Sequence, residues 1–437
     1  MKIAVVGTGY VGLVAGACFA ETGVDVTCVD VDQAKLDRLT QGQVPFFEPG
    51  LDQLVKRNWP DRLHFTTDLA EALQGRQVVF IAVGTPPNED GSADLSHVLG
   101  VAKQVATLAQ NELVITLKST VPVGTNEKVS ALVQGLSKHR IQVCSNPEFL
   151  KEGEAISDFQ KPDRIVIGTD DDPTFEVMSR LYAPFSRQRD RILRMSPKSA
   201  EIVKYAANAL LATKISFMNE IAALCEATGG DVEDVRVALG ADPRIGFQFL
   251  YPGLGFGGSC FPKDLRALVR TGRDLNVDLG VAAAAISANQ QPVEMMLKHL
   301  ERELGGVSGK CIAIWGIAFK PKTDDVREAP ALRLIEALVQ RGASIRATDP
   351  QALETGRIAL KTAGISKGVE LFPDAYEACR GADALVLCTE WNQYRVPDVE
   401  RLKRTMRGHH IFDGRNVMTR EDLLAAGFRY QGFGRAG

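Results

Sequence analysis

The residues with the clearest chemical potential lie in one glycine-rich stretch that ends at a single cysteine. Four glycines fall within residues 253–258, and Cys260, Pro262, Lys263 and Asp264 follow. Glycines let a backbone pass close to a ligand, and proline suits the first turn of a helix. Cys260 would therefore lie at a helix N-terminus, where the helix dipole and Lys263 favour the thiolate. The pattern predicts an activated nucleophile rather than a buried structural cysteine.

A second candidate group lies on a segment that must be helical. Residues 197–228 contain no glycine and no proline after Pro197, and as a helix they would span about 45 Å. Lys204 and Asn208 stand one turn apart on this segment, among apolar neighbours. A lysine in such surroundings is either a surface residue with a buried stem or a desolvated functional amine, and Asn208 favours the second. The broad apolar surface predicts a helix that joins two domains and forms a subunit contact.

The chain opens with the pattern of a dinucleotide site. A predicted strand at residues 2–6 runs into Gly7, Gly9 and Gly12 as G-x-G-x-x-G, residues 15–22 continue as a helix, and a second strand ends at Asp30. Together these features place a pyrophosphate at the helix N-terminus and ribose hydroxyls on Asp30. Carboxylates at Asp30 and Asp32 repel a 2′-phosphate, so NAD is favoured over NADP, although Lys35 tempers this preference.

Further polar residues follow predicted strand ends, where open α/β sheets bind their ligands. Thr85 and Thr120 are candidates to bond the cofactor or a reacting water, although isolated threonines are more often turn residues. Glu148 and Glu152 would share one face if their segment were helical. Such pairs are usually solvated helix charges.

The opening pattern recurs near the C-terminus in an altered form. Predicted strands at 311–315 and 343–348 end in Gly316 and Asp349, but the other pyrophosphate glycines are missing and Lys320 appears instead. Lys322 and Arg327 follow closely. We infer a second α/β unit with a mononucleotide or nucleotide-diphosphate site, the alternative being a solvated charge cluster.

The whole chain is long enough for two or three domains. Its 437 residues carry a net charge of −3, which supplies no basic field for nucleic acid or an acidic membrane. Eight cysteines are scattered singly without metal-binding spacing, which favours a reducing compartment. No signal peptide and no membrane span is expected. We predict an α/β protein with two Rossmann-like doubly wound domains joined by a long central helix: residues 1–195 bind NAD, 196–300 form a helical dimerisation domain with the nucleophile loop, and 301–437 form the second α/β unit, which the resemblance described next implies to be UDP-sugar-binding.

Together the motifs resemble those of the UDP-glucose/GDP-mannose dehydrogenase family along nearly the whole chain. The resemblance is carried by residues 7–13, 146–153, 204–208, 255–265 and 316–327. It implies a cytoplasmic homodimer or higher oligomer that oxidises the primary alcohol of a nucleotide sugar to a carboxylate with two NAD. UDP-glucose is the implied substrate, and GDP-mannose or another nucleotide sugar is the alternative.

The resemblance also implies the site residues, with no metal among them. The implied catalytic residues are Thr120, Glu148, Glu152, Lys204, Asn208, Cys260 and Asp264. The implied cofactor contacts are Gly7, Gly9, Tyr10, Val11, Gly12, Asp30, Lys35, Thr85, Thr120, Glu152, Lys263 and Arg327. The implied substrate contacts are Glu148, Phe149, Leu150, Lys151, Glu152, Lys204, Asn208, Phe249, Leu250, Tyr251, Pro252, Gly253, Gly257 and Lys320, with Arg244 reaching across the dimer.

Oxidising an alcohol to an acid takes two hydride transfers, and the second needs a nucleophile on the aldehyde. Cys260 would form a thiohemiacetal and then a thioester, which water hydrolyses. Lys204 and Asn208 would stabilise the oxyanion, Asp264 would orient Lys204 or the water, and Glu152 with Thr120 would hold the water that takes the first proton.

Two rival functions remain open at this stage. An ordinary two-electron β-hydroxyacid dehydrogenase also places a lysine and an asparagine on a central helix, but it has no use for Cys260. A catalytically silent NAD-binding sensor of nucleotide sugars would need neither the cysteine nor Lys204 and Asp264.

Overall fold

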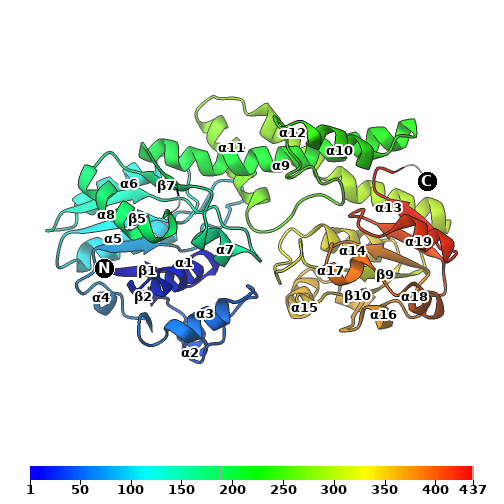
Figure 1. Ribbon diagram of the computed structural model, residues 1–437, viewed down its shortest axis with the longest axis horizontal. Coiled ribbons are helices and arrows are strands. Elements are labelled where there is room, and N and C mark those ends of the chain that lie inside the picture. The colour runs from blue at the N-terminus through cyan, green and yellow to red at the C-terminus, as the bar shows by residue number, and fades with distance from the viewer. Residues whose placement is uncertain (188, 436–437) are drawn as a thin grey trace. The chain divides into compact units, whose positions relative to one another are not determined.

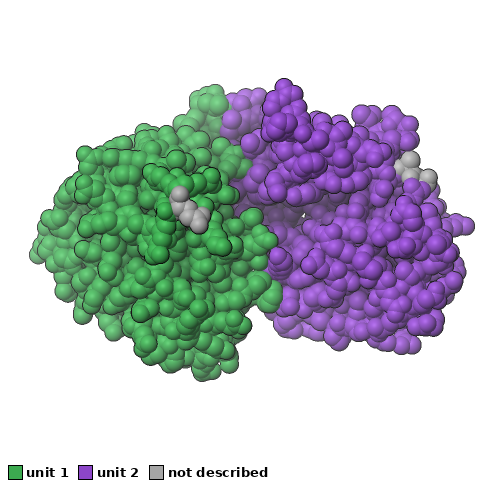
Figure 2. Space-filling model, in the orientation of Figure 1, with its two compact units in different colours: residues 1–207, 270–277 green, residues 208–269, 278–437 purple. Residues whose placement is uncertain are grey.

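The protein is described from a computed structural model that covers residues 1–187 and 189–435. Contacts divide the chain into two compact units, which Figure 2 colours separately. Unit 1 comprises Met1–Ala207 with Arg270–Val277, and unit 2 comprises Asn208–Val269 with Asp278–Gly437. The division falls inside one long helix, α9 (Pro197–Thr228).

Unit 1 is built on a sheet whose described strands have the order β3-β2-β1-β4-β5-β6-β7-β8 (Figure 1). Neighbouring strands are parallel except for β6 and β7. The order of β1 to β6 is that of a doubly wound sheet, which binds ligands where the strand order reverses. The strands are β1 (Lys2–Val6), β2 (Asp25–Val29), β3 (Leu63–Thr66), β4 (Val78–Ile81), β5 (Leu113–Leu117), β6 (Ile141–Ser145), β7 (Ile165–Gly168) and β8 (Ile192–Met195).

Helices cover both faces of the unit 1 sheet, which explains why its strands read as continuous apolar runs. Ile3 and Val5 join a core with α1, whereas Ala4 and Val6 join a second core with α5. Successive residues of a strand thus serve opposite faces. The helices are α1 (Tyr10–Glu21), α2 (Gln33–Thr40), α3 (Leu51–Asn58), α4 (Leu69–Ala72), α5 (Ser96–Leu108), α6 (Thr125–Gln134), α7 (Ala155–Gln160), α8 (Asp172–Tyr182) and the 3-10 helix η1 (Ala183–Phe185).

Unit 2 combines a helical part with a second parallel sheet in the order β11-β10-β9-β12-β13-β14. Counted from β9, this is the strand order of unit 1 again. The helices before the sheet are α10 (Val232–Ala241), α11 (Phe261–Asp274), α12 (Gly280–Ala288) and α13 (Gln291–Leu304). The elements that follow are β9 (Cys311–Trp315), α14 (Pro330–Gln340), β10 (Ser344–Thr348), α15 (Leu353–Thr362), η2 (Ser366–Gly368), β11 (Val369–Leu371), α16 (Ala375–Ala378), β12 (Ala384–Leu387), α17 (Asn392–Arg395), α18 (Val399–Thr405), β13 (His410–Asp413), α19 (Arg420–Ala425) and β14 (Arg429–Gly432).

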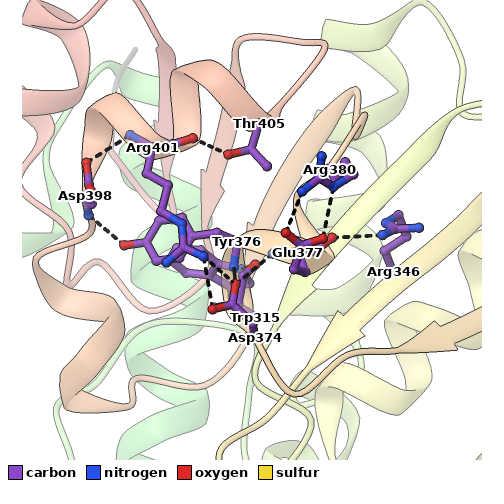
Figure 3. A network of polar contacts seen from close by, with 10 residues as sticks. Trp315, Arg346, Asp374, Tyr376, Glu377, Arg380, Asp398, Arg401 and Thr405 are labelled. Atoms are coloured by element: carbon purple, nitrogen blue, oxygen red, sulfur yellow. Dashed lines mark hydrogen bonds and ion pairs between the residues drawn. The ribbon is translucent and has the colours of Figure 1, made fainter.

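A polar network ties α16 to α18 in unit 2 (Figure 3). The Asp374 side chain caps α16 by accepting hydrogen bonds from the backbone N–H groups of Tyr376 and Glu377, each 2.9 Å long. Arg401 donates to both oxygens of Asp374 at 3.0 and 3.1 Å and covers the Tyr376 ring at 4.1 Å. Burial opposes ionisation, but the Glu377 amide and the Arg401 guanidinium hold the pKa of Asp374 below its usual value. The network therefore fixes short helices that would be unstable alone.

The predicted fold class is confirmed: two doubly wound parallel sheets accompany a long helix. The strands predicted at 2–6 and 311–315 have those bounds, whereas α1 begins at Tyr10, five residues before the predicted helix. The three domain boundaries stay a prediction. No helix among the described residues is long and apolar enough to span a membrane.

Candidate active site

The G-x-G-x-x-G turn between β1 and α1 has two glycines that serve the fold and one that leaves room for a ligand. A Cβ on Gly7 would lie 2.8 Å from the Ala82 carbonyl oxygen, and one on Gly12 would lie 1.9 Å from the Gly7 carbonyl oxygen. A Cβ on Gly9 would meet nothing within 4 Å. Gly9 is the N-cap of α1, where backbone N–H groups face an anion. The turn therefore fits the pyrophosphate of NAD.

Asp30 follows β2 beside this turn, as predicted. Its Oδ2 accepts hydrogen bonds from the Thr8 backbone at 2.9 Å and from the Thr8 hydroxyl at 2.6 Å, and it pairs with Lys35 Nζ at 2.7 Å. Burial alone would raise the pKa of Asp30, but the Lys35 and Thr8 hydrogen bonds lower it to about 2. The acceptor is thus ionised and held at the end of its strand, where ribose hydroxyls would bind.

The strand-end threonines lie together at the carboxyl ends of β4 and β5. The Thr85 hydroxyl donates to the Thr120 carbonyl oxygen at 3.0 Å. Thr120, Ser145, Glu201 and Lys204 help to line a small cavity beside them, with room for about one water molecule. Each carboxylate oxygen of Glu201 already accepts a hydrogen bond from a backbone N–H group, of Gly124 or of Asn126, at 2.7 Å. Thr120 and Lys204 are therefore the lining residues whose polar groups we consider for a role in the reaction.

Lys204 is buried and its ammonium lies 5.5 Å from the centre of the Phe149 ring. Phe149 belongs to the segment 148–152 that was predicted to contact the substrate, and Arg164 covers the same ring at 4.0 Å. Contacts from two cations restrict the position of the ring. The geometry brings Lys204, Phe149 and Thr120 into one region of unit 1.

Glu148 and Glu152 do not share a helix face, because residues 146–151 have no regular structure and α7 begins only at Ala155. Glu148 Oε1 instead accepts the backbone N–H groups of Phe149 and Leu150 at 2.6 and 3.0 Å. Its Oε2 lies 2.8 Å from the Nζ of Lys118, a fully buried lysine. Glu148 therefore shapes its own turn, and Glu152 lies on the following one.

Lys118 was missed in the sequence analysis. Burial alone would lower the pKa of this ammonium, but Glu148 and Tyr182 raise it above its ordinary value. Lys118 also donates to Asn146 at 3.2 Å and to Tyr182 at 3.3 Å. A lysine at the end of a buried strand was the available signal, since burial of an unpaired ammonium is costly.

The glycine-rich loop of unit 2 is shaped by its packing against the C-terminal domain. A Cβ on Gly253 would lie 2.5 Å from the Gly414 carbonyl oxygen, and one on Gly257 would lie 2.5 Å from that of Glu328. Gly258 has a φ of 83°, and its Cβ would lie 2.8 Å from the Phe319 ring. The glycines therefore make room for neighbouring protein atoms, whereas the sequence predicts that they make room for a ligand.

Cys260 leaves this loop as the residue before α11, where the sequence predicted a helix N-terminus. Its carbonyl oxygen accepts the Asp264 N–H at 2.8 Å, and its thiol is exposed, 3.5 Å from the Ser259 hydroxyl. Asp264 is only 1% exposed and is bonded on both oxygens, to Asn208 Nδ2 at 2.6 Å and to Lys263 Nζ at 2.7 Å. Asn208, Asp264 and Lys263 therefore form one hydrogen-bonded group behind the cysteine.

The predicted substrate segment 249–253 lies immediately before the loop. Phe249 has a φ of 63°, a conformation that few non-glycine residues adopt and that often marks functional sites. Its ring lies 6.1 Å from those of Tyr251 and Phe261, while the Gly253 N–H donates to the buried Asn219 at 2.8 Å. Leu250 and Pro252 are buried. The segment is therefore held on both sides of Tyr251, which remains exposed.

The acidic residue of the second sheet is bonded more fully than that of the first, where, among the described residues, Oδ1 of Asp30 accepts only the Asp32 N–H at 3.2 Å. Asp349 occupies the place of Asp30, but it accepts backbone N–H groups from Ile317 and Ala318 on one oxygen and from Gln351 and Ala352 on the other. A carboxylate saturated in this way has no acceptor left for a ribose. This difference agrees with a second site that is not a dinucleotide site.

Other predicted residues near the second site face the loop. Lys320 Nζ lies 5.4 Å from the Phe319 ring, and the Arg327 carbonyl oxygen accepts the Gly258 N–H at 2.8 Å.

Two other predicted substrate contacts form ion pairs of their own. Lys151 pairs with Glu154 and Asp158, whereas Arg244 is exposed and pairs with Asp242. Within the described residues, no group of three or more His, Cys, Asp or Glu side chains could hold a metal ion.

Three family models match consecutive parts of the chain. The NAD binding domain of the UDP-glucose/GDP-mannose dehydrogenase family matches residues 1–186, its central domain matches 198–291, and its UDP binding domain matches 313–420. The chain belongs to the UDP-glucose/GDP-mannose dehydrogenase family. Membership confirms the resemblance inferred from the motifs, and the first match confirms the prediction of NAD as the cofactor. The third match supports a nucleotide-sugar substrate.

Individual relatives in this family are similar over their whole length. A protein from Pseudomonas aeruginosa named UDP-glucose 6-dehydrogenase is 48% identical over 442 residues, covering 100% of this chain and 98% of that protein. A solved UDP-glucose dehydrogenase from the archaeon Pyrobaculum islandicum is 37% identical with a TM-score of 0.91, covering 100% and 98% of the two chains. A solved GDP-mannose dehydrogenase from Pseudomonas aeruginosa is 30% identical with a TM-score of 0.54, covering 99% and 100%.

We expect Cys260 to be the first cysteine that iodoacetamide modifies in the native protein near neutral pH. Of the eight cysteines, Cys260 is exposed and Cys311 is half-buried, while the others are buried. Burial raises the pKa of Cys28, Cys144 and Cys388 to about 12 each, so these thiols stay neutral. Peptide mass spectrometry after brief labelling checks this expectation, with Cys260→Ser as the control. First labelling at a buried cysteine would contradict it.

Proposed function

We propose that this protein oxidises UDP-glucose to UDP-glucuronate with two NAD and one water, through a covalent intermediate on Cys260. The observation that carries the proposal is an exposed thiol at the N-terminus of α11, with Asp264 bonded to Asn208 and Lys263 behind it. Membership of the family and the NAD binding domain at residues 1–186 support it. A two-electron dehydrogenase would leave this thiol without a role.

The proposed chemistry divides the four-electron oxidation into two hydride losses. NAD, when bound in unit 1, would supply the hydride acceptor for both losses. After the first loss, the Cys260 thiolate adds to the aldehyde carbon and forms a thiohemiacetal. Loss of the second hydride gives a thioester, and water then breaks its C–S bond, releasing the carboxylate and regenerating the thiol. Both the attack and the leaving step use the Cys260 sulfur, which lies directly before the first residue of α11.

The other proposed roles follow from the groups that each unit holds. Lys204, buried on the Phe149 ring, would stabilise the alkoxide and the oxyanions. Thr120 and Glu152 would hold the water that takes the first proton. The one-water cavity lined by Thr120 supports the part proposed for Thr120. Asp264 bonds Asn208 and Lys263, so it would position these two groups, and its proposed role of orienting Lys204 or the water stays a prediction. Glu148 shapes the 148–152 turn.

We propose UDP-glucose rather than GDP-mannose as the substrate, because the sequence of this chain is more similar to that of a relative named for UDP-glucose. The protein from Pseudomonas aeruginosa named UDP-glucose 6-dehydrogenase is 48% identical, and the solved GDP-mannose dehydrogenase is 30% identical. The UDP binding domain match at residues 313–420 supports the same choice of nucleotide. Lys320 is proposed to meet the diphosphate there, and Arg327 is proposed to contact the cofactor.

We expect the purified protein to release two NADH for each UDP-glucose consumed. Absorbance at the NADH band, with UDP-glucuronate quantified by chromatography, measures this ratio. GDP-mannose in the same assay should give little NADH. Cys260→Ser should still bind the nucleotide sugar but should form no free acid, because a serine hydroxyl is a far weaker nucleophile than a thiolate. One NADH per sugar, or full turnover by Cys260→Ser, would reject the scheme.

We also propose that the protein is a cytoplasmic homodimer or higher homo-oligomer. Leu210, Phe217 and Leu224 stand seven residues apart on α9 and are 65%, 48% and 57% exposed. Side chains at this spacing form one stripe along a helix, and apolar stripes are typical of subunit contacts. Arg244 is exposed, which leaves its side chain available to a partner. The cytoplasm is supported by cysteines that are all unpaired, including the proposed nucleophile.

We expect the double variant Leu210→Glu, Phe217→Glu to have a lower solution mass than the unmodified protein. Charges buried in an apolar contact are costly, so association should weaken. Light scattering after size-exclusion chromatography measures the mass. Val396→Glu, which charges a residue that is 81% exposed and outside the stripe, should leave the mass unchanged. An unchanged mass in the double variant would mean that the stripe is not the subunit contact.

A further inference from the structure

Glu48 has no role in the predicted site, yet the residue is only 5% exposed and its carboxylate joins three separate segments of unit 1. It lies between α2 and α3. Oε2 accepts the Gly153 N–H at 2.6 Å and a short hydrogen bond from the Tyr10 hydroxyl, and Oε1 accepts the Ala155 N–H at 2.9 Å. The Tyr10 hydroxyl also accepts the Gly153 N–H at 3.0 Å.

The segments that Glu48 joins are those predicted to hold the cofactor and to carry Glu152. Tyr10 is the first residue of α1 and follows Gly9, which leaves open space at the helix N-terminus. Gly153 and Ala155 lie on either side of the start of α7, immediately after Glu152. Glu48 is 38 residues from Tyr10 and 105 residues from Gly153 along the chain, so neither contact is local.

The hydrogen bonds of Glu48 have a fixed direction. An ionised carboxylate only accepts, and both of its oxygens here face donors. Burial, followed by the Glu48 hydrogen bond, raises the pKa of Tyr10 far above its ordinary value, so the phenol keeps its proton and remains a donor. The Tyr10 ring also packs on Phe46, with centroids 5.2 Å apart. Tyr10 and the Glu152 turn are therefore held by one buried carboxyl group.

We propose that Glu48 is a positioning residue that sets Glu152 in register with the cofactor loop. It holds the backbone directly after Glu152 through Gly153 and Ala155, and it holds the first turn of α1 through Tyr10. The inference rests on the proposed function, because it deepens the role given there to Glu152. A misplacement of about 1 Å in a group that handles a reacting proton can cost about 10²-fold in rate.

Glutamine cannot replace this carboxylate even though its shape is nearly the same. One of its two terminal atoms is an NH₂ donor, which would face the N–H of either Gly153 or Ala155. The Ala155 N–H would then lose its carboxylate acceptor in a buried place, or the Gly153 N–H would keep only the Tyr10 hydroxyl, and either change is unfavourable. Tyr10→Phe removes the link to α1 and the second acceptor of the Gly153 N–H, but it leaves both backbone bonds of Glu48 in place. The two variants therefore separate the two arms of the network.

The test compares Glu48→Gln, Glu152→Gln and the double variant by kcat with saturating NAD and UDP-glucose. We expect Glu48→Gln to lower kcat about 10²-fold. When Glu152 is already glutamine, the same substitution should lower kcat by less than about 3-fold further, since the effects of residues that act through one group are not additive.

Two further measurements separate the two links of Glu48. Hydrogen exchange of the peptide with residues 150–158 in the protein without ligands should speed up in Glu48→Gln but not in Tyr10→Phe. Titration calorimetry should show weaker NAD binding in Tyr10→Phe.

Arg76→Met is the matched control, because Arg76 is also buried but pairs with Asp25 and Thr27 at the other ends of the strands. We expect it to lower the melting temperature without changing kcat. Equal losses from Glu48→Gln in both backgrounds, or unchanged exchange at residues 150–158, would overturn the proposal. If Glu48→Gln does not fold, Glu48→Asp, which keeps both oxygens on a shorter arm, undergoes the same measurements with the same expected results. An inactive unmodified protein with the expected exchange pattern would reject the proposed function but not the positioning role.

Discussion

The hydrogen bond between Asn208 and Asp264 is the interaction on which the proposed chemistry of unit 2 depends. It joins the long helix α9 to the first turn of α11 inside the protein, and Lys263 satisfies the second Asp264 oxygen. A buried carboxylate is stable only when it is paired in this way. These hydrogen bonds fix the first turn of α11, and Cys260, the residue before it, remains exposed.

The glycine-rich loop that precedes Cys260 is also held in place by its neighbours. Asn289 holds Phe256 by two hydrogen bonds, at 2.8 Å to its N–H and 2.9 Å to its carbonyl oxygen, while Gly253 and Gly258 lie against Gly414 and Phe319. The thiol is therefore presented by a backbone with little freedom to move. A nucleophile that is positioned in advance loses less entropy when it reacts.

Buried charges serve the same purpose in unit 1. The segment 146–154 has no helix or strand to hold it, and Lys118 and Glu48 bind it from different sides through Glu148 and Gly153. Irregular segments can place functional side chains only when neighbouring groups fix their backbone. The proposed proton-handling residue Glu152 lies between these two points of attachment.

Much of the fold could be predicted because its signals are local. Continuous apolar runs identified the strands at 2–6 and 311–315, and the absence of glycine after Pro197 identified α9. The start of α1 was placed too late, because Gly12 was read as part of the turn although it lies in the helix. Cys260 was placed correctly at a helix N-terminus, since proline and glycine specify that geometry themselves.

The remaining features depend on contacts between residues that are far apart in the sequence. Nothing local shows that Lys118 pairs with Glu148 or that Glu48 binds Gly153, because those partners are brought together only by the folded sheet. The glycines of the loop were assigned to a ligand for the same reason, since Gly414 and Glu328 lie far away along the chain. Glu148 and Glu152 were considered as a helical pair, whereas Glu148 bonds its own turn.

The most direct measurement of the central claim is the mass of the Cys260 peptide after rapid acid quenching during turnover of UDP-glucose with NAD. A thioester survives acid, so the account predicts a fraction of that peptide carrying a UDP-glucuronyl group, which disappears when the substrate is exhausted. A Cys260 peptide that stays unmodified at every time point, while NADH and UDP-glucuronate accumulate in the same samples, would contradict covalent catalysis by this cysteine.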